Sequence, residues 1–171
     1  MVATLFVKMT RKVGGPIEGD ATEKAHSKWI VVNSVGFTAE RTSEQEGGSK
    51  ARGFGKAKIS PMSFESELGG HSMPLMMASV AGNVMTEVLI HQCKASDDDK
   101  AALQPYILWK LKEVMVQTYG VTGDSEDIPK ESWTLIYDSI ECEYWAPKKR
   151  GGPLEKVNEF KWDVSEGVMA G

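Results

Sequence analysis

Two glutamates near the end of the chain have the spacing of a carboxylate pair. Glu141 and Glu143 lie two residues apart in a strand-like run over 133–145, so both side chains are expected on one face. Glycosidases also use two carboxylates, but these flank a cleft from separate elements and differ in environment. The pair is therefore interpreted as a solvent-facing surface or as a surface that meets a partner's lysines. A hydrolase is a minor alternative that requires a cleft facing this pair.

A histidine and a cysteine alternate in the same way on an earlier run. His91 and Cys93 point to one side of a predicted strand and could offer two ligands to a metal. Zinc normally takes at least three protein ligands, and the sequence indicates no third. We therefore expect a partly buried histidine beside a thiol, and no metal site.

Glycines and lysines gather between residues 47 and 57, which invites comparison with a phosphate-binding loop. Such a loop needs a glycine five positions before its Gly-Lys pair, and a serine or threonine after the pair. Lys50 occupies the first of these positions and Ala57 follows Lys56, so the motif fails twice. A nucleophile elbow is also lacking. The sequence therefore predicts no cofactor and no catalytic residue.

One segment has the periodicity of a helix, over about 73–82. Met73, Met76, Met77 and Val80 fall at i, i+3, i+4 and i+7, which places them on one helical face. Ser72 is the expected N-cap, and Gly82 can take the left-handed C-terminal position. We interpret the methionine face as core packing, because Met fills irregular gaps well, in preference to a copper or peptide site.

The composition is that of one soluble domain over residues 1–171. The net charge of −4 and the isoelectric point near 5.5 argue against nucleic-acid binding. No segment approaches a membrane span, and the N-terminus lacks the pattern of a signal peptide. We expect synthesis in the reducing cytoplasm, with Cys93 and Cys142 as free thiols, and export by a route that needs no signal peptide.

The rest of the chain is divided by turn-rich segments into short strand-like runs. They are expected at residues 5–9, 26–40, 56–68, 85–93, 106–119, 133–145 and 157–164. Gly14-Gly15-Pro16 is expected as a turn, 26–40 as a single strand covered on two sides, and Pro61 at an edge or bulge. In the run over 133–145, one face is assigned Ile136, Ile140, Cys142 and Tyr144. This pattern predicts a mainly β, single-domain barrel or sandwich and argues against a doubly wound nucleotide-binding fold.

The order of these features resembles the Hcp family (hemolysin-coregulated protein) over nearly the whole chain. The segment 26–34 looks like the second strand of that family, and Ser72-Met73-Pro74-Leu75 is similar to its Ser/Thr-x-Pro-x-Leu pattern. Residues 106–116 resemble its tyrosine-to-valine strand, and 131–137 its Glu-x-hydrophobic-x-hydrophobic-x-Tyr strand. Trp162-Asp163-Val164 is similar to the closing strand. The acidic turn over 94–100 is a departure, being longer than expected of that hairpin.

The resemblance implies a structural protein, not an enzyme. The implied fold is a β-barrel of two packed sheets with one short flanking helix, assembling as a hexameric ring. Rings stack into the inner tube of a type VI secretion system, with a VgrG-type spike at the tip and a contractile sheath that expels the tube. The lumen carries or stabilises small secreted effectors, and the protein is released from the cytoplasm on firing. No nucleic acid and no membrane insertion are implied.

The resemblance also places an extended loop that reaches a neighbouring ring at residues 42–56. The segment combines charges with glycines that remove any strong local preference, and it is long for an ordinary connection. Its ring-stacking residues are expected to be Glu44, Glu46, Gly47, Gly48, Lys50, Arg52, Gly53 and Lys56. The rival hypothesis is a monomeric β-barrel that binds a small ligand in its interior, and oligomeric state separates the two.

Overall fold

The structure, a computed structural model, describes residues 4–44, 53–94, 102–166 and 168–169. Its one helix among these residues is α1, Ser72–Ala81. The strands are β1 Leu5–Arg11, β2 Gly15–Ile17, β3 Ile30–Val31, β4 Ser34–Gly36, β5 Ala39–Glu44, β6 Gly53–Ile59, β7 Met62–Glu67, β8 Val84–Lys94, β9 Gln104–Thr122, β10 Lys130–Pro147, β11 Leu154–Asp163 and β12 Val168–Met169. The predicted mainly β fold with one short flanking helix is confirmed.

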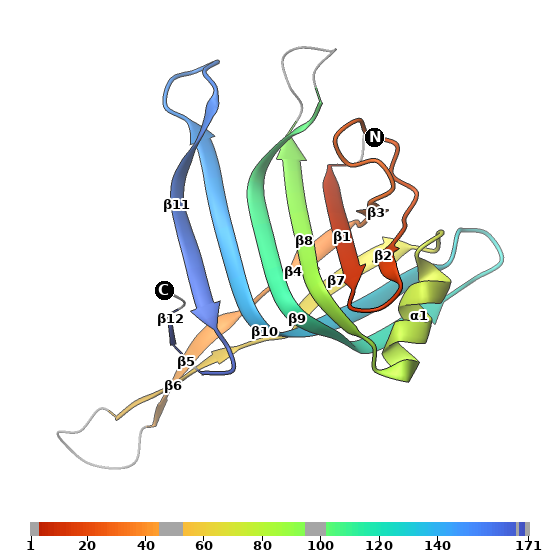
Figure 1. Cartoon of the computed structure of the whole chain (residues 1–171), viewed down its shortest axis with the longest axis horizontal. Coiled ribbons are helices and arrows are strands. Elements are labelled where there is room, and N and C mark those ends of the chain that lie inside the picture. The colour runs from red at the N-terminus through yellow and green to blue at the C-terminus, as the bar shows by residue number, and fades with distance from the viewer. Residues whose placement is uncertain (1–3, 45–52, 95–101, 167, 170–171) are drawn as a thin grey trace.

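One large antiparallel sheet contains ten of these strands. Its main order is β12-β11-β10-β9-β8-β1-β2, with β3 beside β1, β7 beside β10 and β4 beside β7. Strand β10 uses the same edge twice, because Ser139–Pro147 pairs with β11 whereas Lys130–Leu135 pairs with β7. The two packed layers are thus halves of one continuous, bent sheet (Figure 1). Strands β5 and β6 form a separate ribbon, which extends away from the body of the subunit.

The bend occurs along one line that crosses the three longest neighbouring strands. Met85, Val114 and Tyr137 form one buried row, and Val88, Leu111 and Ile140 form the next. Successive inward residues on a strand are normally two apart, but here they are three apart on all three strands. Glu113, one of the residues between the rows, has a φ of 49°, in the left-handed region that non-glycine residues rarely adopt. The bend turns both halves of each strand towards the same core.

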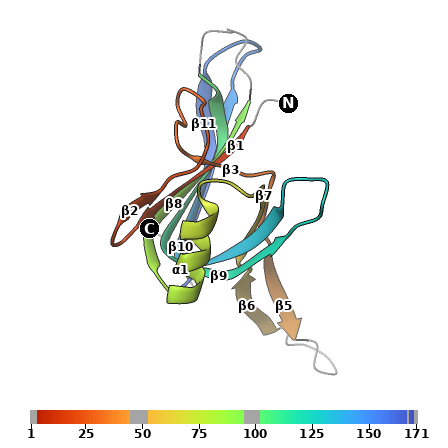
Figure 2. The same ribbon diagram turned by 90° about the vertical axis from the view of Figure 1, so that its right-hand side faces the viewer.

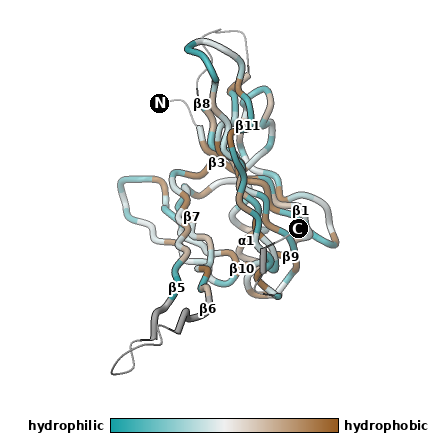
Figure 3. The backbone as a smooth tube through the Cα atoms, turned by 90° about the vertical axis from the view of Figure 1, so that its left-hand side faces the viewer, coloured by the Kyte–Doolittle hydropathy of each residue, from teal (hydrophilic) through white to brown (hydrophobic). Residues whose placement is uncertain are grey.

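The core lies inside this bend and is closed by α1, which lies beside the lower parts of the long strands (Figure 2). Hydrophobic and hydrophilic positions alternate along the strands (Figure 3). The largest buried side chains include Trp133, Phe64, Met9 and Ile90, and the rings of Phe64 and Trp133 stack at 4.3 Å. The helix contributes Leu75 and Ala78 to this core.

The bend also corrects the predicted face of the run over 133–145. Ile140 is buried, but Ile136 is 40% exposed, because the inward positions change from odd to even numbers between Tyr137 and Ile140. A strict period of two could not predict this change.

The predicted packing of the methionine face is wrong. Met73, Met77 and Val80 are 56%, 67% and 86% exposed, whereas the buried helix residues are Ser72, Leu75 and Ala78. The helix presents its smaller side chains and Leu75 to the sheet, which lets it lie close to β9. The N-cap is His71 and not Ser72, whose hydroxyl instead accepts a hydrogen bond of 2.9 Å from the Gly69 N–H. The left-handed C-cap at Gly82 is confirmed.

Two predicted runs are subdivided. Residues 26–40 contain β3, β4 and the start of β5 instead of one strand, and 56–68 is broken at Ser60-Pro61 between β6 and β7. Gly15-Pro16, expected in a turn, belongs to the short strand β2 that pairs with the end of β1. The predicted turn over 94–100 lies outside the described residues apart from Lys94, which ends β8.

A buried carboxylate joins α1 to the sheet. Glu131 on β10 accepts hydrogen bonds from the Ser66 hydroxyl (2.7 Å), from the Tyr119 hydroxyl and from His71 at the helix N-terminus. Burial raises the pKa of Glu131, but the hydrogen bonds from Tyr119 and Ser66 and the charge of His71 outweigh burial, so the pKa lies below its ordinary value. Burial and the bond to Glu131 raise the pKa of Tyr119 to about 12. Glu131 is therefore held as an anion.

The two cysteines are free, as predicted. Cys93 lies on β8 and Cys142 on β10, with β9 between them. Two strand spacings amount to about 9–10 Å, beyond the reach of a disulfide at about 7 Å between Cα atoms. Burial, followed by the charges of Glu23 and Glu143 respectively, raises the pKa of Cys93 to about 12 and that of Cys142 to about 11.

We predict that Glu131→Gln lowers the free energy of unfolding by about 2–4 kcal/mol, because breaking a buried network leaves its partners unpaired. Urea unfolding at pH 7 measures this difference, and Glu67→Gln, at an exposed position on β7, is the control. Since the folded pKa of Glu131 is depressed, its contribution is complete above pH 4.5 and is lost as the pH falls below that value. An unfolding free energy within about 0.5 kcal/mol of wild type would contradict this role of Glu131.

We also predict that both thiols resist iodoacetamide in the folded protein at pH 8, since the thiolate is the reactive form. Mass spectrometry should find two alkylated cysteines only after unfolding in guanidinium chloride. Rapid labelling of either cysteine in the native state would contradict the protonated state of that thiol, which is buried at Cys93 and half-buried at Cys142.

Candidate functional site

The segment Glu18–Trp29 forms a strap that covers one end of β1 and β8 between β2 and β3 (Figure 1). Its ends are tied together, because the Gly19 N–H donates to the Lys28 carbonyl (2.8 Å) and the Ala21 N–H donates to the Trp29 carbonyl (3.0 Å). A Cβ at Gly19 would lie 2.4 Å from the Trp29 carbonyl oxygen, so only glycine fits there. Asp20 accepts a hydrogen bond of 2.9 Å from the Gly70 N–H, which ties the strap to the segment before α1.

The strap brings together four side chains that could act as acids, bases or nucleophiles. His26 Nδ1 lies 2.5 Å from the Glu23 carboxylate, and His26 Nε2 lies 3.0 Å from His91 Nδ1 on β8. The Cys93 Sγ is 3.9 Å from the same Nε2 atom. His26 is only 2% exposed and its ring stacks on Phe6 of β1, with centroids 4.6 Å apart.

Glu23, His26 and Cys93 have the order of an orienting acid, a base and a thiol nucleophile. Chemistry of that kind needs an accessible thiolate. Cys93 is 4% exposed and the pKa of its thiol is raised to about 12, and His91 occupies the side of His26 that would activate the thiol. The cluster is therefore suited to fixing the strap in place and not to nucleophilic catalysis.

The interpretation of His91 and Cys93 as a partly buried histidine beside a thiol fits this geometry. Within the described part of the chain, no group of three His, Cys, Asp or Glu residues is arranged to hold a metal ion. The sequence did not identify His26 as a neighbour of His91 and Cys93, because it lies 65 residues from His91 in the chain. A local pattern could not have paired these positions, which are also joined by the contact of the Trp29 and His91 rings at 4.7 Å.

Glu141 and Glu143 lie on the open face of the sheet beside this cluster. They line a depression of about 230 Å³ together with Leu89, His91, Leu108, Trp109 and Lys110. Glu143 accepts a hydrogen bond of 3.0 Å from the Trp145 indole and lies 3.7 Å from the Lys156 ammonium. Both carboxylates come from one strand and share one environment, so the arrangement is that of a surface charge pair and lacks the opposed acids of a glycosidase.

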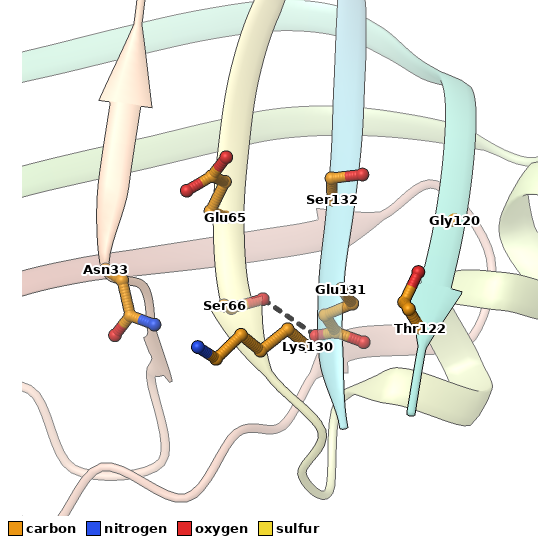
Figure 4. A pocket seen from close by; sticks show the side chains of 8 residues that line it. All are labelled: Asn33, Glu65, Ser66, Gly120, Thr122, Lys130, Glu131 and Ser132. Carbon is orange, nitrogen blue, oxygen red and sulfur yellow. Dashed lines mark hydrogen bonds between the residues drawn. The ribbon is translucent and has the colours of Figure 1, made fainter. Parts of the chain in front are cut away.

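A second, more polar groove of about 300 Å³ lies where β7, β9 and β10 approach β4 (Figure 4). Its lining residues are Asn33, Glu65, Ser66, Gly120, Thr122, Lys130, Glu131 and Ser132. Glu131, its most buried acid, points towards Ser66 in Figure 4 and is already occupied by three hydrogen-bond donors. This groove therefore offers no free acid or base with a shifted pKa for catalysis.

The predicted ring-stacking segment, 42–56, forms both sides of the separate ribbon. Strand β5 continues to Glu44, and β6 begins at Gly53, opposite Glu44. Residues 42–44 and 53–56 are thus in paired strands and not in a loop. The predicted residues Glu46, Gly47, Gly48, Lys50 and Arg52 lie outside the described residues.

No helix in the described part of the chain is long and apolar enough to cross a membrane.

Comparisons with known proteins identify the same fold in other chains. A type VI secretion system protein of solved structure has 21% identity and a TM-score of 0.85, covering 99% of this chain and 100% of that chain. Hcp1 from Salmonella typhimurium has 16% identity and a TM-score of 0.73, covering 98% and 99%. A chain of the anti-feeding prophage baseplate has 12% identity and a TM-score of 0.53, covering 83% and 93%. A comparison with curated proteins gave no match.

The sequence itself matches a family model over most of its length. The model described as "Type VI secretion system effector, Hcp" aligns with residues 6–144. This range contains nearly all of β1, all of β2 to β9 and α1, and most of β10, and therefore the bend of the sheet, the strap and the ribbon. The chain belongs to the Hcp family, the tail-tube proteins of the type VI secretion system.

Proposed function

We propose that six copies of this chain close into a ring and that the rings stack into the tube of a type VI secretion system. The observation that carries the proposal is the family match over residues 6–144, in a fold that spans the whole chain. In this proposal a contractile sheath expels the tube, a VgrG-type spike forms its tip, and small secreted effectors travel in its lumen. The chain acts without catalysis, and it leaves the cell with the tube.

The β5–β6 ribbon supports the stacking part of this proposal. Its strands pair with each other and with no other described strand, and they project from the body of the subunit (Figure 1). A two-stranded ribbon is marginally stable in water by itself. A contact with a neighbouring ring would stabilise it, and the charges of Glu44, Lys50, Arg52 and Lys56 suit a complementary surface.

Exposed apolar side chains support assembly as well. Met73, Met77 and Val80 form one face of α1, and Val13 in the turn between β1 and β2 is 87% exposed. Large apolar surfaces on a soluble protein mark sites that a partner covers. A second copy in a ring is the partner that the proposal supplies.

The rival hypothesis of a small-ligand barrel has less support. A ligand-binding barrel keeps a cavity among its inward side chains, whereas the interior here is occupied by large buried residues such as Trp133, Met62 and Leu135. The two depressions described above lie at the surface.

We predict that the purified protein is a closed ring of six in native mass spectrometry, with little monomer at micromolar concentration. Head-to-tail contacts that close produce cyclic symmetry. A soluble monomer that persists at high concentration would argue for the rival hypothesis.

We further predict that reversing Lys50 and Arg52 to glutamate leaves the rings intact but reduces tube growth and secretion several-fold. The variant alters the proposed inter-ring contact and not the core. Lys149→Glu with Arg150→Glu is the matched control, since both residues are exposed in the turn between β10 and β11 and lie outside the ribbon. If the K50E/R52E protein still forms normal tubes and is exported normally, this segment has no role in stacking.

A further inference from the structure

The His26–His91 pair has room for only one proton between its two rings. The Glu23 carboxylate can only accept hydrogen bonds, so the Nδ1 atom of His26 that faces it carries a proton. The other contact joins two nitrogens, His26 Nε2 and His91 Nδ1, at 3.0 Å. One of them donates and the other accepts. If both rings are fully protonated, two N–H groups face each other and the bond is lost.

The groups around the His26–His91 pair determine how easily a second proton binds between the two rings. On the strap, the charged group nearest the pair is Glu23; on β8, the neutral thiol of Cys93 lies beside it. Strand β1 contributes Phe6, opposite His91, and then Lys8, opposite Leu89. On the open face, the depression that contains His91 also contains Lys110 of β9 and Glu141 and Glu143 of β10. His91 is partly exposed in that depression, so protons from solvent can reach it.

The pKa of His91 supports an effect in mildly acidic solution. Burial, and then the positive charge of His26, lower this pKa from 6.5 to about 4. When folding lowers the pKa of a histidine, its contribution to stability is complete above the pKa of the unfolded chain. That contribution is lost as the pH falls towards the pKa of the folded protein. The window is therefore from about pH 6.5 down to about pH 4, and it begins well above pH 4.5, where Glu131 starts to lose its contribution.

We propose that the Glu18–Trp29 strap is an acid-released latch, which opens when His26 and His91 are both protonated. Among the described residues, the other contacts of this end are the hydrogen bond from the Leu103 N–H to Glu23 (3.0 Å), the stacking of His26 on Phe6 and the packing of the Trp29 ring on His26 and His91. The opposite end stays attached through Asp20 and Gly70. The main core lies on the other face of β1 and β8 and does not depend on the pair.

Opening exposes the small apolar cluster under the strap. Phe6, Ala21 and Cys93 are 1%, 6% and 4% exposed in the closed state, with Trp29 and Val31 packed against them. An apolar surface that becomes exposed in this way is a site that a partner can cover. Acidity would thus change what this end of the subunit can bind, whether or not the subunit is in a ring.

Fluorine NMR of the protein labelled with 5-fluorotryptophan can test this latch. The five tryptophans give five resonances, and Trp29→Phe assigns the one from the strap. From pH 7 to pH 4.5, we expect the Trp29 resonance to move to the position of an exposed residue while Trp109, Trp133, Trp145 and Trp162 keep theirs. His91→Gln should keep a hydrogen bond to His26 without titrating, and so should lower the midpoint of the Trp29 change by roughly one pH unit or more.

A Trp29 resonance that does not change down to pH 4.5 overturns the latch. So does a change of all five resonances together, which would be global unfolding, or a midpoint that is the same in His91→Gln. If His91→Gln does not fold, the wild-type titration still distinguishes a local change at Trp29 from no change and from global unfolding. Native mass spectrometry of the same samples reports the oligomer separately, so failure of the latch and failure of ring formation are distinguishable.

Discussion

The structure depends on one constraint, the shared bend of β8, β9 and β10. Along this line the inward positions on each strand are three residues apart, so that the buried rows ending at Tyr137 and at Ile140 both face one core. The bend lets the upper part of β10 pair with β11 and the lower part pair with β7 on the same edge. Without it the sheet would be flat and one half would lose its core, because a shift of one position moves every side chain to the other face.

Two histidine centres connect the remaining segments to this bent sheet. Glu131 and His71 join α1 to β9 and β10, and the His26–His91 pair joins the strap to β8. Among the described residues, every buried side-chain nitrogen or oxygen has a hydrogen-bond partner. These polar centres specify how the short elements dock, whereas the apolar rows provide most of the stabilisation. The surfaces left for partners are the ribbon, the exposed face of α1 and the open face of the sheet.

The sequence predicted the helix and the long strand runs, because the Gly82 cap and period-two alternation are local signals. It did not predict which side of α1 is buried, since Met73, Met77 and Val80 satisfy a helical period equally well on an exposed face. The sequence also did not predict that the inward positions of β10 change from odd to even numbers near Asp138, nor that His26 pairs with His91. Both depend on contacts between distant segments, and a single sequence carries no local trace of them.

The central claim is that this chain functions as a ring that stacks, and electron microscopy of the purified protein tests it most directly. We expect six-fold rings around an open lumen, and stacked rings at high protein concentration in which the β5–β6 ribbon of one ring touches the next. Particles of monomer size in every condition, with no rings or tubes, would contradict it.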